Sequence, residues 1–314
     1  MAVRALRLFS VSWAVTCRCN LSCAYCSFAN FEESELGFDQ IASLLEQLRG
    51  AGMRILRITG GEPLLREDLP DLIRFARGMG VFTTIATNGI LLPDKIEKYI
   101  GVEGIFVSID GMERMNDMIR GKGSSSLAWK AIEAAKRNKI PACIAATMTS
   151  ESIDNITSLV KSAFCQNVPI FFQPATAQRP FSSNKNIHFA DEDTIRQACQ
   201  LLCSLKSRYK NIVNSYSGLK YFSSGYRART FRCFASTLFL RISPSGNVTS
   251  CSRSLPTQDI PNLVRDGVVS CLRRLRVPAC NACTCASLLE ANLLASGDLF
   301  ALVNMVTQFF QRKA

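Results

Sequence analysis

The sequence predicts an α/β protein in which βα units form either an open partial (β/α)6 TIM-like barrel or a doubly wound sheet, followed by a smaller α+β domain. Short β-branched runs alternate six times with amphipathic runs in the first 175 residues, which is typical of parallel βα units. Beyond that point come a loop rich in Ser, Asn, Gln and Pro and then a hairpin. We therefore expect a core barrel over 1–175, a linker with barrel-closing helices over 176–230, and a small C-terminal domain over 231–314.

The expected strands are short runs rich in β-branched and aromatic residues. They are Phe9–Val15, Ile55–Thr59, Phe82–Ala86, Ile105–Ile109, Ala142–Thr147 and Pro169–Phe172. Apolar residues at helical spacing lie between them, within 41–48, 72–76, 96–100, 127–135 and 156–163. We expect a further helix from about Asp191 to Tyr209, then a hairpin of Leu238–Ile242 and Val248–Ser250. The segment Leu288–Phe310 is expected to form one helix that packs on the core, in preference to docking on a membrane surface.

The N-terminal residues are expected to form a strand and not an export signal. Arg7 interrupts the apolar run, and Leu6 and Leu8 alternate with other residues as they would in a strand. We therefore expect a cytoplasmic protein, where thiols stay reduced.

Composition narrows the function further. The chain has 37 Lys and Arg against 25 Asp and Glu, a formal charge of +12, and it has 14 cysteines but one histidine, His188. One histidine argues against a multi-histidine zinc enzyme and against a histidine relay. We expect His188 at the surface, in the loop after the sixth strand. The cysteines are left to form metal or cluster sites, or to be scattered thiols.

Three thiols follow the first strand closely. Cys19, Cys23 and Cys26 fall within eight residues, a spacing that lets three sulfurs converge on one soft metal centre. With no fourth ligand, one iron of a cluster would stay open to an outside molecule. A structural zinc site would need a fourth thiol, for which Cys17 is the candidate, although its spacing to Cys19 is tight.

Further polar motifs follow the next strands in order. The second strand is followed by Gly60-Gly61-Glu62-Pro63, the third by Thr87-Asn88-Gly89, and the fourth ends in Ser108-Ile109-Asp110-Gly111, with Arg120 beyond it. Residues at the carboxyl ends of parallel strands face one mouth, where such folds bind ligands. Together with the C-x3-C-x2-C triplet, in which Tyr25 precedes the last cysteine, these motifs resemble the radical S-adenosylmethionine (radical SAM) superfamily from Leu8 to about Pro174.

The resemblance implies the partial (β/α)6 TIM-like barrel, a [4Fe–4S] cluster with an open iron, and S-adenosylmethionine. One electron would cleave the sulfonium, and the 5′-deoxyadenosyl radical would abstract a substrate hydrogen. It also implies the cofactor-binding residues Tyr25, Gly60, Gly61, Glu62, Pro63, Asn88, Ser108, Asp110 and Arg120. Glu62 suits the methionine ammonium. The short polar groups Asn88, Ser108 and Asp110 suit ribose hydroxyls, and Arg120 suits the carboxylate.

The C-terminal cysteines resemble the auxiliary-cluster domains of the same superfamily. Cys233 and Cys251 flank the expected hairpin in a C-x12-G-x4-C pattern, and Cys280 and Cys283 follow as C-x2-C. The resemblance implies a second [4Fe–4S] cluster of the single-cluster "twitch" type. The longer SPASM pattern is broken after Cys283. Substitute ligands are Cys271 and Cys285, and the alternatives are a zinc ribbon or unligated thiols.

The net charge of the chain indicates a substrate class. An excess of basic residues favours an anionic substrate, either a small molecule or a peptide. Only about eight residues precede the first strand, which disfavours a leader-binding domain and therefore leader-dependent peptide maturation. No nucleic-acid partner is expected, and a reductant such as flavodoxin or ferredoxin is needed. The alternatives are a peptide-modifying maturase and a non-catalytic iron–sulfur electron carrier. A carrier would not need the residues that resemble an S-adenosylmethionine pocket.

Overall fold

Parallel strands form the centre of the computed structural model, which describes residues 8–311 apart from 27, 29–31, 176–187, 226–230, 252–258, 278–279 and 281. The strands are β1 (Ser10–Ala14), β2 (Ile55–Thr59), β3 (Phe82–Thr87), β4 (Gly104–Ser108), β5 (Ala142–Met148), β6 (Ile170–Pro174), β7 (Phe239–Ile242) and β8 (Val248–Thr249). They form one eight-stranded sheet in the order β6-β5-β4-β3-β2-β1-β7-β8. The predicted α/β fold class is confirmed.

The expected hairpin lies in the same sheet as the barrel strands. Its first strand, β7, pairs in parallel with β1, and β8 pairs antiparallel with β7. The free edge of β6 is joined by the segment around Ile212, since the Ile170 N–H donates to the Asn211 carbonyl and the Val213 N–H to the Ile170 carbonyl, both at 2.8 Å. The sheet is therefore extended at β1 and covered at β6.

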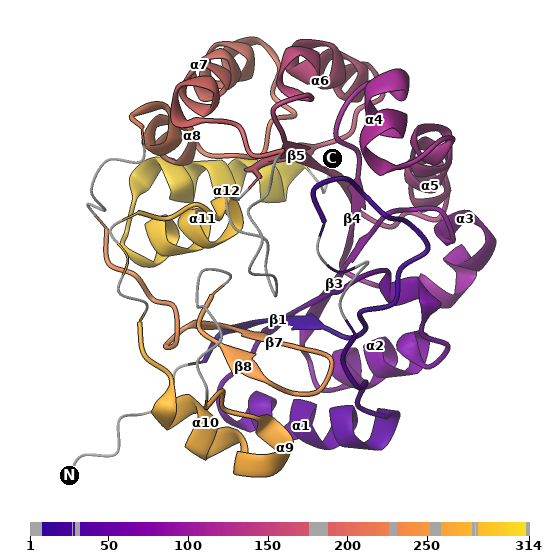
Figure 1. Ribbon diagram of the computed structural model, residues 1–314, viewed down its shortest axis with the longest axis vertical. Coiled ribbons are helices and arrows are strands. Elements are labelled where there is room, and N and C mark those ends of the chain that lie inside the picture. The colour runs from indigo at the N-terminus through magenta and orange to yellow at the C-terminus, as the bar shows by residue number, and fades with distance from the viewer. Residues whose placement is uncertain are drawn as a thin grey trace.

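Most of the helices surround the curved sheet on its outside (Figure 1). The α-helices of the described residues are α1 (Phe38–Gly50), α2 (Leu69–Gly78), α3 (Leu92–Lys95), α4 (Glu113–Arg120), α5 (Ser124–Arg137), α6 (Ile156–Cys165), α7 (Glu192–Arg208), α8 (Tyr216–Ser223), α9 (Leu263–Asp266), α10 (Val268–Arg274), α11 (Ala286–Ala295) and α12 (Leu299–Gln311). Three 3-10 turns, Pro63–Leu65, Ile96–Tyr99 and Ile153–Asn155, complete the set of named elements.

Strand alternation separates two faces of the sheet. The outer face packs in the buried core, with Trp13, Ile58 and Ile85 all 2% exposed or less. Successive side chains of a strand point to opposite faces, so residues such as Ser12 and Arg57 line the inner face. The inner face thus carries polar and charged groups in the barrel interior.

The single helix expected over Leu288–Phe310 is wrong, because the segment forms two helices, α11 and α12. Gly297, with φ +81°, ends α11: its N–H donates to the Leu294 carbonyl and that of Asp298 to the Leu293 carbonyl. The Asp298 carboxylate then accepts the Ala301 N–H at 2.8 Å, which starts α12. No single helix of the described residues is long and apolar enough to cross a membrane, although α11 and Leu299–Met305, bent by 109°, meet that criterion together by length and composition.

Candidate active site

The loop that carries Cys19, Cys23 and Cys26 leaves the carboxyl end of β1 and is held from two sides. On one side the Gly61 N–H donates to the Thr16 carbonyl at 2.9 Å, and the Glu62 N–H to the Arg18 carbonyl at 2.8 Å. On the other side the Ala24 N–H donates to the carbonyl of Ile119 in α4 at 2.9 Å. The three thiols are partly buried in this loop.

The Gly-Gly pair packs directly against this cysteine loop. A Cβ atom on Gly60, where φ is +139°, would lie 2.3 Å from the Thr16 carbonyl oxygen, and one on Gly61 would lie 2.3 Å from that of Arg18. Such distances are far inside van der Waals contact, so both positions require glycine. The two glycines therefore allow the backbones to pass closely, and their contact with the cofactor stays a prediction.

Glu62 is fully buried and joins the ends of β2 and β3. Its Oε1 accepts the Leu64 N–H at 3.0 Å and the Thr87 hydroxyl at 2.9 Å, and its Oε2 accepts the Asn88 N–H at 2.7 Å. A carboxylate offers about four acceptor positions. Three are occupied by described residues, which leaves room for one further donor such as an ammonium group. Burial raises the pKa of this carboxyl, and a bound cation would lower it again.

Asn88 also contacts the cysteine loop. Its Nδ2 donates to Asn20 Oδ1 at 2.7 Å and lies 4.0 Å from Cys19 Sγ, and its Oδ1 accepts the Ile90 N–H at 3.0 Å. Asn88 thereby links the end of β3 to the cysteine loop. Ser108 ends β4 and is half-buried, and Pro63 begins the buried turn after Glu62.

Tyr25 of this loop forms a cluster with Asp110 and Arg120, in which Tyr25 is half-buried and the other two residues are buried. Asp110 accepts the Tyr25 hydroxyl at 3.0 Å, the Arg120 Nη2 at 3.0 Å and the Thr147 N–H at 2.7 Å. The Arg120 Nη2 also donates to the Tyr25 hydroxyl, and its Nη1 lies 3.9 Å from Cys23 Sγ. The ion pair between Arg120 and Asp110, 2.7 Å between Nε and Oδ2, fixes the positive charge beside Cys23.

The pKa values of the thiols bear on whether they can bind a metal cluster. Burial raises the pKa of Cys23 to about 11, against the opposing charge of Arg120, and burial also raises the pKa of Cys19. A metal ion supplies the positive charge that a buried thiolate lacks, so a bound cluster would deprotonate these thiols. Three thiols and an open carboxylate position in one mouth fit a cluster and an amino-acid ligand. In the described part of the chain, no three Cys, His, Asp or Glu side chains are already gathered as around a metal ion.

The comparisons with known proteins agree with this geometry. Residues 13–162 match the family model described as the radical SAM superfamily. This chain contains a radical SAM domain. The AdoMet-dependent heme synthase of Methanosarcina barkeri is 28% identical over 264 residues, which cover 77% of this chain and 76% of that relative.

A second relative and a solved structure extend the comparison. The mycofactocin maturase MftC of Mycolicibacterium smegmatis is 25% identical over 273 residues, 82% of this chain and 68% of that protein. The structure of Streptococcus suis SuiB bound to S-adenosylmethionine gives a TM-score of 0.68 at 18% identity, over 83% of this chain and 64% of SuiB. SuiB therefore shares the fold. This chain is a radical SAM enzyme, and its family implies a [4Fe–4S] cluster and S-adenosylmethionine.

The C-terminal cysteines of this radical SAM enzyme act on one another electrostatically. Burial raises the pKa of Cys283 to about 12, and Cys285, Cys233 and Cys251 all lie close enough for their charges to add to the shift. The Cys283 N–H donates to the Tyr221 hydroxyl of α8 at 2.8 Å. Gln173 of β6 accepts the Ala286 N–H at 2.6 Å and donates to the Thr284 carbonyl at 3.0 Å. The segment before α11 is thereby tied to the inner face of β6.

Several residues of the site were missed by the sequence analysis. The Arg66 side chain donates to the Val15 and Leu36 carbonyls, both at 3.0 Å, and so fixes the chain where it leaves β1. The Thr87 hydroxyl donates a hydrogen bond to Glu62, and the Thr147 N–H donates one to Asp110. Contacts of backbone groups leave no sequence signal, whereas Arg66, three residues after Pro63, could have been considered with the motif.

His188 is half-buried and not simply exposed. Its Nδ1 lies 2.7 Å from the Glu151 carboxylate, which follows β5, and the Ser150 N–H donates to the His188 carbonyl at 3.1 Å. The pair tethers the segment around His188 to the β5 side of the barrel.

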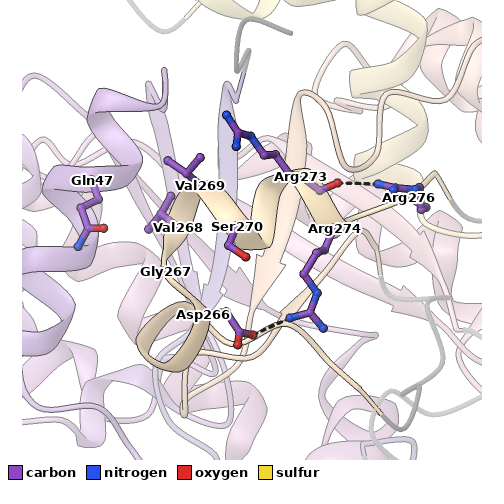
Figure 2. Close-up of a pocket in the computed structure, with 9 residues that line it drawn as sticks. All are labelled: Gln47, Asp266, Gly267, Val268, Val269, Ser270, Arg273, Arg274 and Arg276. Carbon is purple, nitrogen blue, oxygen red and sulfur yellow. Dashed lines mark hydrogen bonds and ion pairs between the residues drawn. The ribbon is translucent and has the colours of Figure 1, made fainter. Parts of the chain in front are cut away.

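A pocket of about 580 Å³ lies elsewhere, between α1 and the α9–α10 helices, and its lining includes three arginines (Figure 2). Arg274 is paired with Asp266 at 3.0 Å, and Arg276 donates to the Arg273 carbonyl at 2.6 Å. None of the predicted site residues line this pocket, so the candidate active site remains the mouth of the barrel.

Proposed function

We propose that this protein cleaves S-adenosylmethionine reductively and uses the resulting 5′-deoxyadenosyl radical to abstract hydrogen from a small anionic substrate. The observation that carries the proposal is the convergence of the cysteine loop, Glu62, Asn88 and the Asp110–Arg120 pair at the carboxyl ends of β1 to β4. The chain has 37 basic and 25 acidic residues, and this surplus of positive charge supports an anionic substrate.

In this proposal Cys19, Cys23 and Cys26 ligate the first cluster. When bound, the cluster and S-adenosylmethionine supply the electron and the radical. The Arg120 charge beside Cys23 stabilises its thiolate, and the remaining acceptor position of Glu62 receives the ammonium group.

The remaining pocket residues position the rest of the molecule. Asn88 and Ser108 serve the ribose, whereas Asp110, predicted for the same role, already has four donors and instead holds Tyr25 and Arg120 in place. Arg120 has five N–H donors, and its Nη1 group contacts only Cys23 among the described residues, so a donor is left for the methionine carboxylate. Tyr25, clamped between Asp110 and Arg120, holds the loop in place.

The auxiliary cysteines extend the proposal to a second [4Fe–4S] cluster. Cys233, Cys251 and Cys283 belong to both the sequence pattern and the spatial group. The fourth ligand is Cys280 in the sequence pattern, whereas Cys285 is the thiol whose charge raises the pKa of Cys283 most. Separate Cys280→Ser and Cys285→Ser variants identify the ligand, because only its loss should lower the iron content.

Iron analysis and product detection test this function together. Anaerobically reconstituted protein should bind about eight irons per chain, and dithionite should release 5′-deoxyadenosine from S-adenosylmethionine. Cys23→Ala should lose half the iron and all cleavage, whereas Cys165→Ala, which removes an exposed thiol of α6, should lose neither. A content of about four irons would refute the second cluster. Absence of 5′-deoxyadenosine from fully loaded protein would leave the electron-carrier alternative.

A peptide substrate is the second candidate, and a specific observation favours it. One relative, 25% identical over 82% of this chain, is named a maturase. Candidate anions and peptides can be compared by the amount of 5′-deoxyadenosine that forms in the presence of each. An electron donor such as flavodoxin or ferredoxin would replace dithionite in the cell.

A further inference from the structure

Two arginines stand in one row on the inner face of the sheet. Ser12 of β1 is in register with Arg57 of β2 on one side and with Arg241 of β7 on the other. Residues in register across a sheet share a face, and neighbouring strands are about 4.8 Å apart, so the two arginine Cα atoms are separated by roughly 10 Å. The adjacent Ile58 and Ile242 belong to the buried outer core, which places the arginines inside the barrel.

Neither guanidinium has a hydrogen-bond or ion-pair partner among the described residues. The backbones of Arg57 and Arg241 pair within the sheet, whereas their side chains form no hydrogen bond or ion pair in that part of the chain. All 25 Asp and Glu residues lie in the described part of the chain, so none of their carboxylates pairs with these two arginines. Arg66 and Arg120, the buried arginines elsewhere, are both paired with aspartates, at 2.7 Å each.

These two charges lie in a partly dehydrated interior. Burial lowers the pKa of both guanidinium groups, although a guanidinium remains charged in proteins. Two like charges half-buried within one interior also repel each other. Such an arrangement is tolerated where an external anion neutralises it.

The row lies between the two proposed cofactor sites. The Cys285 thiol is within electrostatic reach of both arginines, and that of Cys251 is within reach of Arg241. In the other direction β1 continues for two residues to Ala14, about 7 Å further along the strand, before the cysteine loop begins. An anion held at this row would extend toward the mouth where the radical is generated.

We infer that Arg57 and Arg241, with the Ser12 hydroxyl between them, bind an oxyanion of the substrate, a carboxylate or a phosphate, and so hold its far end toward the mouth. This inference rests on the proposed function and specifies its substrate class. Two guanidinium forks suit such a group because each can donate two parallel hydrogen bonds.

Anion binding to the reconstituted protein tests the inference. Glutarate and inorganic phosphate serve as probes, and isothermal titration calorimetry under anaerobic conditions measures the binding of each. Wild-type protein should bind at least one of them saturably. Arg57→Gln and Arg241→Gln should each weaken that binding about tenfold or more, as the loss of one charged hydrogen-bonding partner does. The exposed Arg54→Gln, just before β2, should bind as wild type does.

Three further measurements separate this role from others. Because the two charges are unpaired, both variants should keep the wild-type melting temperature or exceed it, whereas a structural arginine would lower it. Their iron content and uncoupled 5′-deoxyadenosine formation should also be unchanged. Loss of about half the iron would show that the arginines instead neutralise the auxiliary cluster. Wild-type affinity in the variants, or no binding of either anion to wild type, would also overturn the inference.

Failure of the proposed function would look different, because wild-type protein would then form no 5′-deoxyadenosine. If only glutarate binding requires the two arginines, the bound group is a carboxylate. If only phosphate binding requires them, it is a phosphate.

Discussion

The backbone of the cysteine loop passes so close to Gly61 that one added methyl group would clash with it. The nearest atoms to a Cβ at this position are the carbonyl oxygens of Arg18, at 2.3 Å, and Cys17, at 2.6 Å. Backbone cannot move aside as a flexible side chain can. The loop that carries three proposed cluster ligands would have to shift instead.

Gly61→Ala is therefore expected to lower the free energy of unfolding by about 1–3 kcal/mol, the usual cost of overpacking, and to impair assembly of the first cluster. Chemical denaturation of the apoprotein and iron analysis of the reconstituted protein measure the two effects. Gly78→Ala is the matched control, since a Cβ there meets nothing within 4 Å and alanine favours a helix. Equal stability of the two variants would contradict the steric argument.

Lys206 is a buried cation far from the mouth and gives a pH-dependent test. Burial lowers its pKa from 10.5 to about 8, while its Nζ donates to the Ile212 carbonyl at 2.6 Å and to Asn304 Oδ1 at 2.9 Å. Because the folded pKa is below the unfolded one, the unfolded state binds more protons between these pH values. Stability from this group therefore rises as pH increases from about 8 to 10.5.

The wild-type protein should gain up to about 3 kcal/mol over this window that Lys206→Met does not. Urea denaturation of both proteins at pH 7 and at pH 10, with a reductant present, measures the difference. Lys161→Met, which removes an exposed lysine of α6, should follow the wild-type slope. Parallel pH slopes for wild type and Lys206→Met would show that burial does not depress this lysine.

At the residue scale the sequence predicted which side chains meet but not what each of them contacts. The motif residues after β1 to β4 do share one mouth, because parallel strands end on the same side. The Asp110–Arg120 ion pair was not expected, since both residues were assigned to the ligand. Arg57 and Arg241 were also missed, although an arginine in the middle of an alternating strand is a signal that could have been used.

At the scale of elements, the segment from Cys283 to Cys285 depends on one glutamine of β6. Gln173 uses both ends of its amide to bind the segment, at the Thr284 carbonyl and the Ala286 N–H. Leucine would fill the same space without either bond.

Gln173→Leu should therefore reduce iron at the auxiliary site and leave S-adenosylmethionine cleavage intact, because the first cluster is held by other elements. The iron content should fall toward four per chain, the value for one [4Fe–4S] cluster. Gln200→Ala, on the exposed face of α7, is the control. A variant that keeps about eight irons would show that Tyr221 and α11 suffice to position the segment.

The alternation of apolar and polar residues predicted where the strands begin and end. It did not predict which distant elements pair with one another. Each of the first six strands begins and ends within two residues of its expected limits, since burial on the outer face repeats every second residue. The hairpin was also predicted, but its parallel pairing with β1 was not, because no local pattern identifies a remote partner. The break between α11 and α12 was missed although Gly297 and Asp298 are typical end and start residues.

At the scale of the whole molecule, the two proposed clusters act over different spans of the chain. The first closes a single loop after β1, which a backbone hydrogen bond holds against α4. The second connects the hairpin at Cys251 to the segment before α11. Ligands that bind only the folded state stabilise it by mass action.

Removal of iron by a chelator should accordingly lower the melting temperature by several degrees. Anaerobic scanning calorimetry of the loaded and stripped protein tests this expectation. The Cys251→Ala variant should show about half the effect if each cluster contributes independently. Identical melting temperatures for loaded and stripped protein would show that packing alone holds these segments together.

The pairing of β1 with β7 also has a consequence in time. Ser10 lies opposite Phe239, so the first strand made by the ribosome acquires its second neighbour more than 200 residues later. At roughly 5–20 residues per second, that delay is on the order of 10–45 s, during which one edge of β1 has no partner. An unpaired edge is prone to join other chains. The N-terminal cysteines are available for iron throughout this interval, whereas the auxiliary site cannot form until the sheet can also be completed.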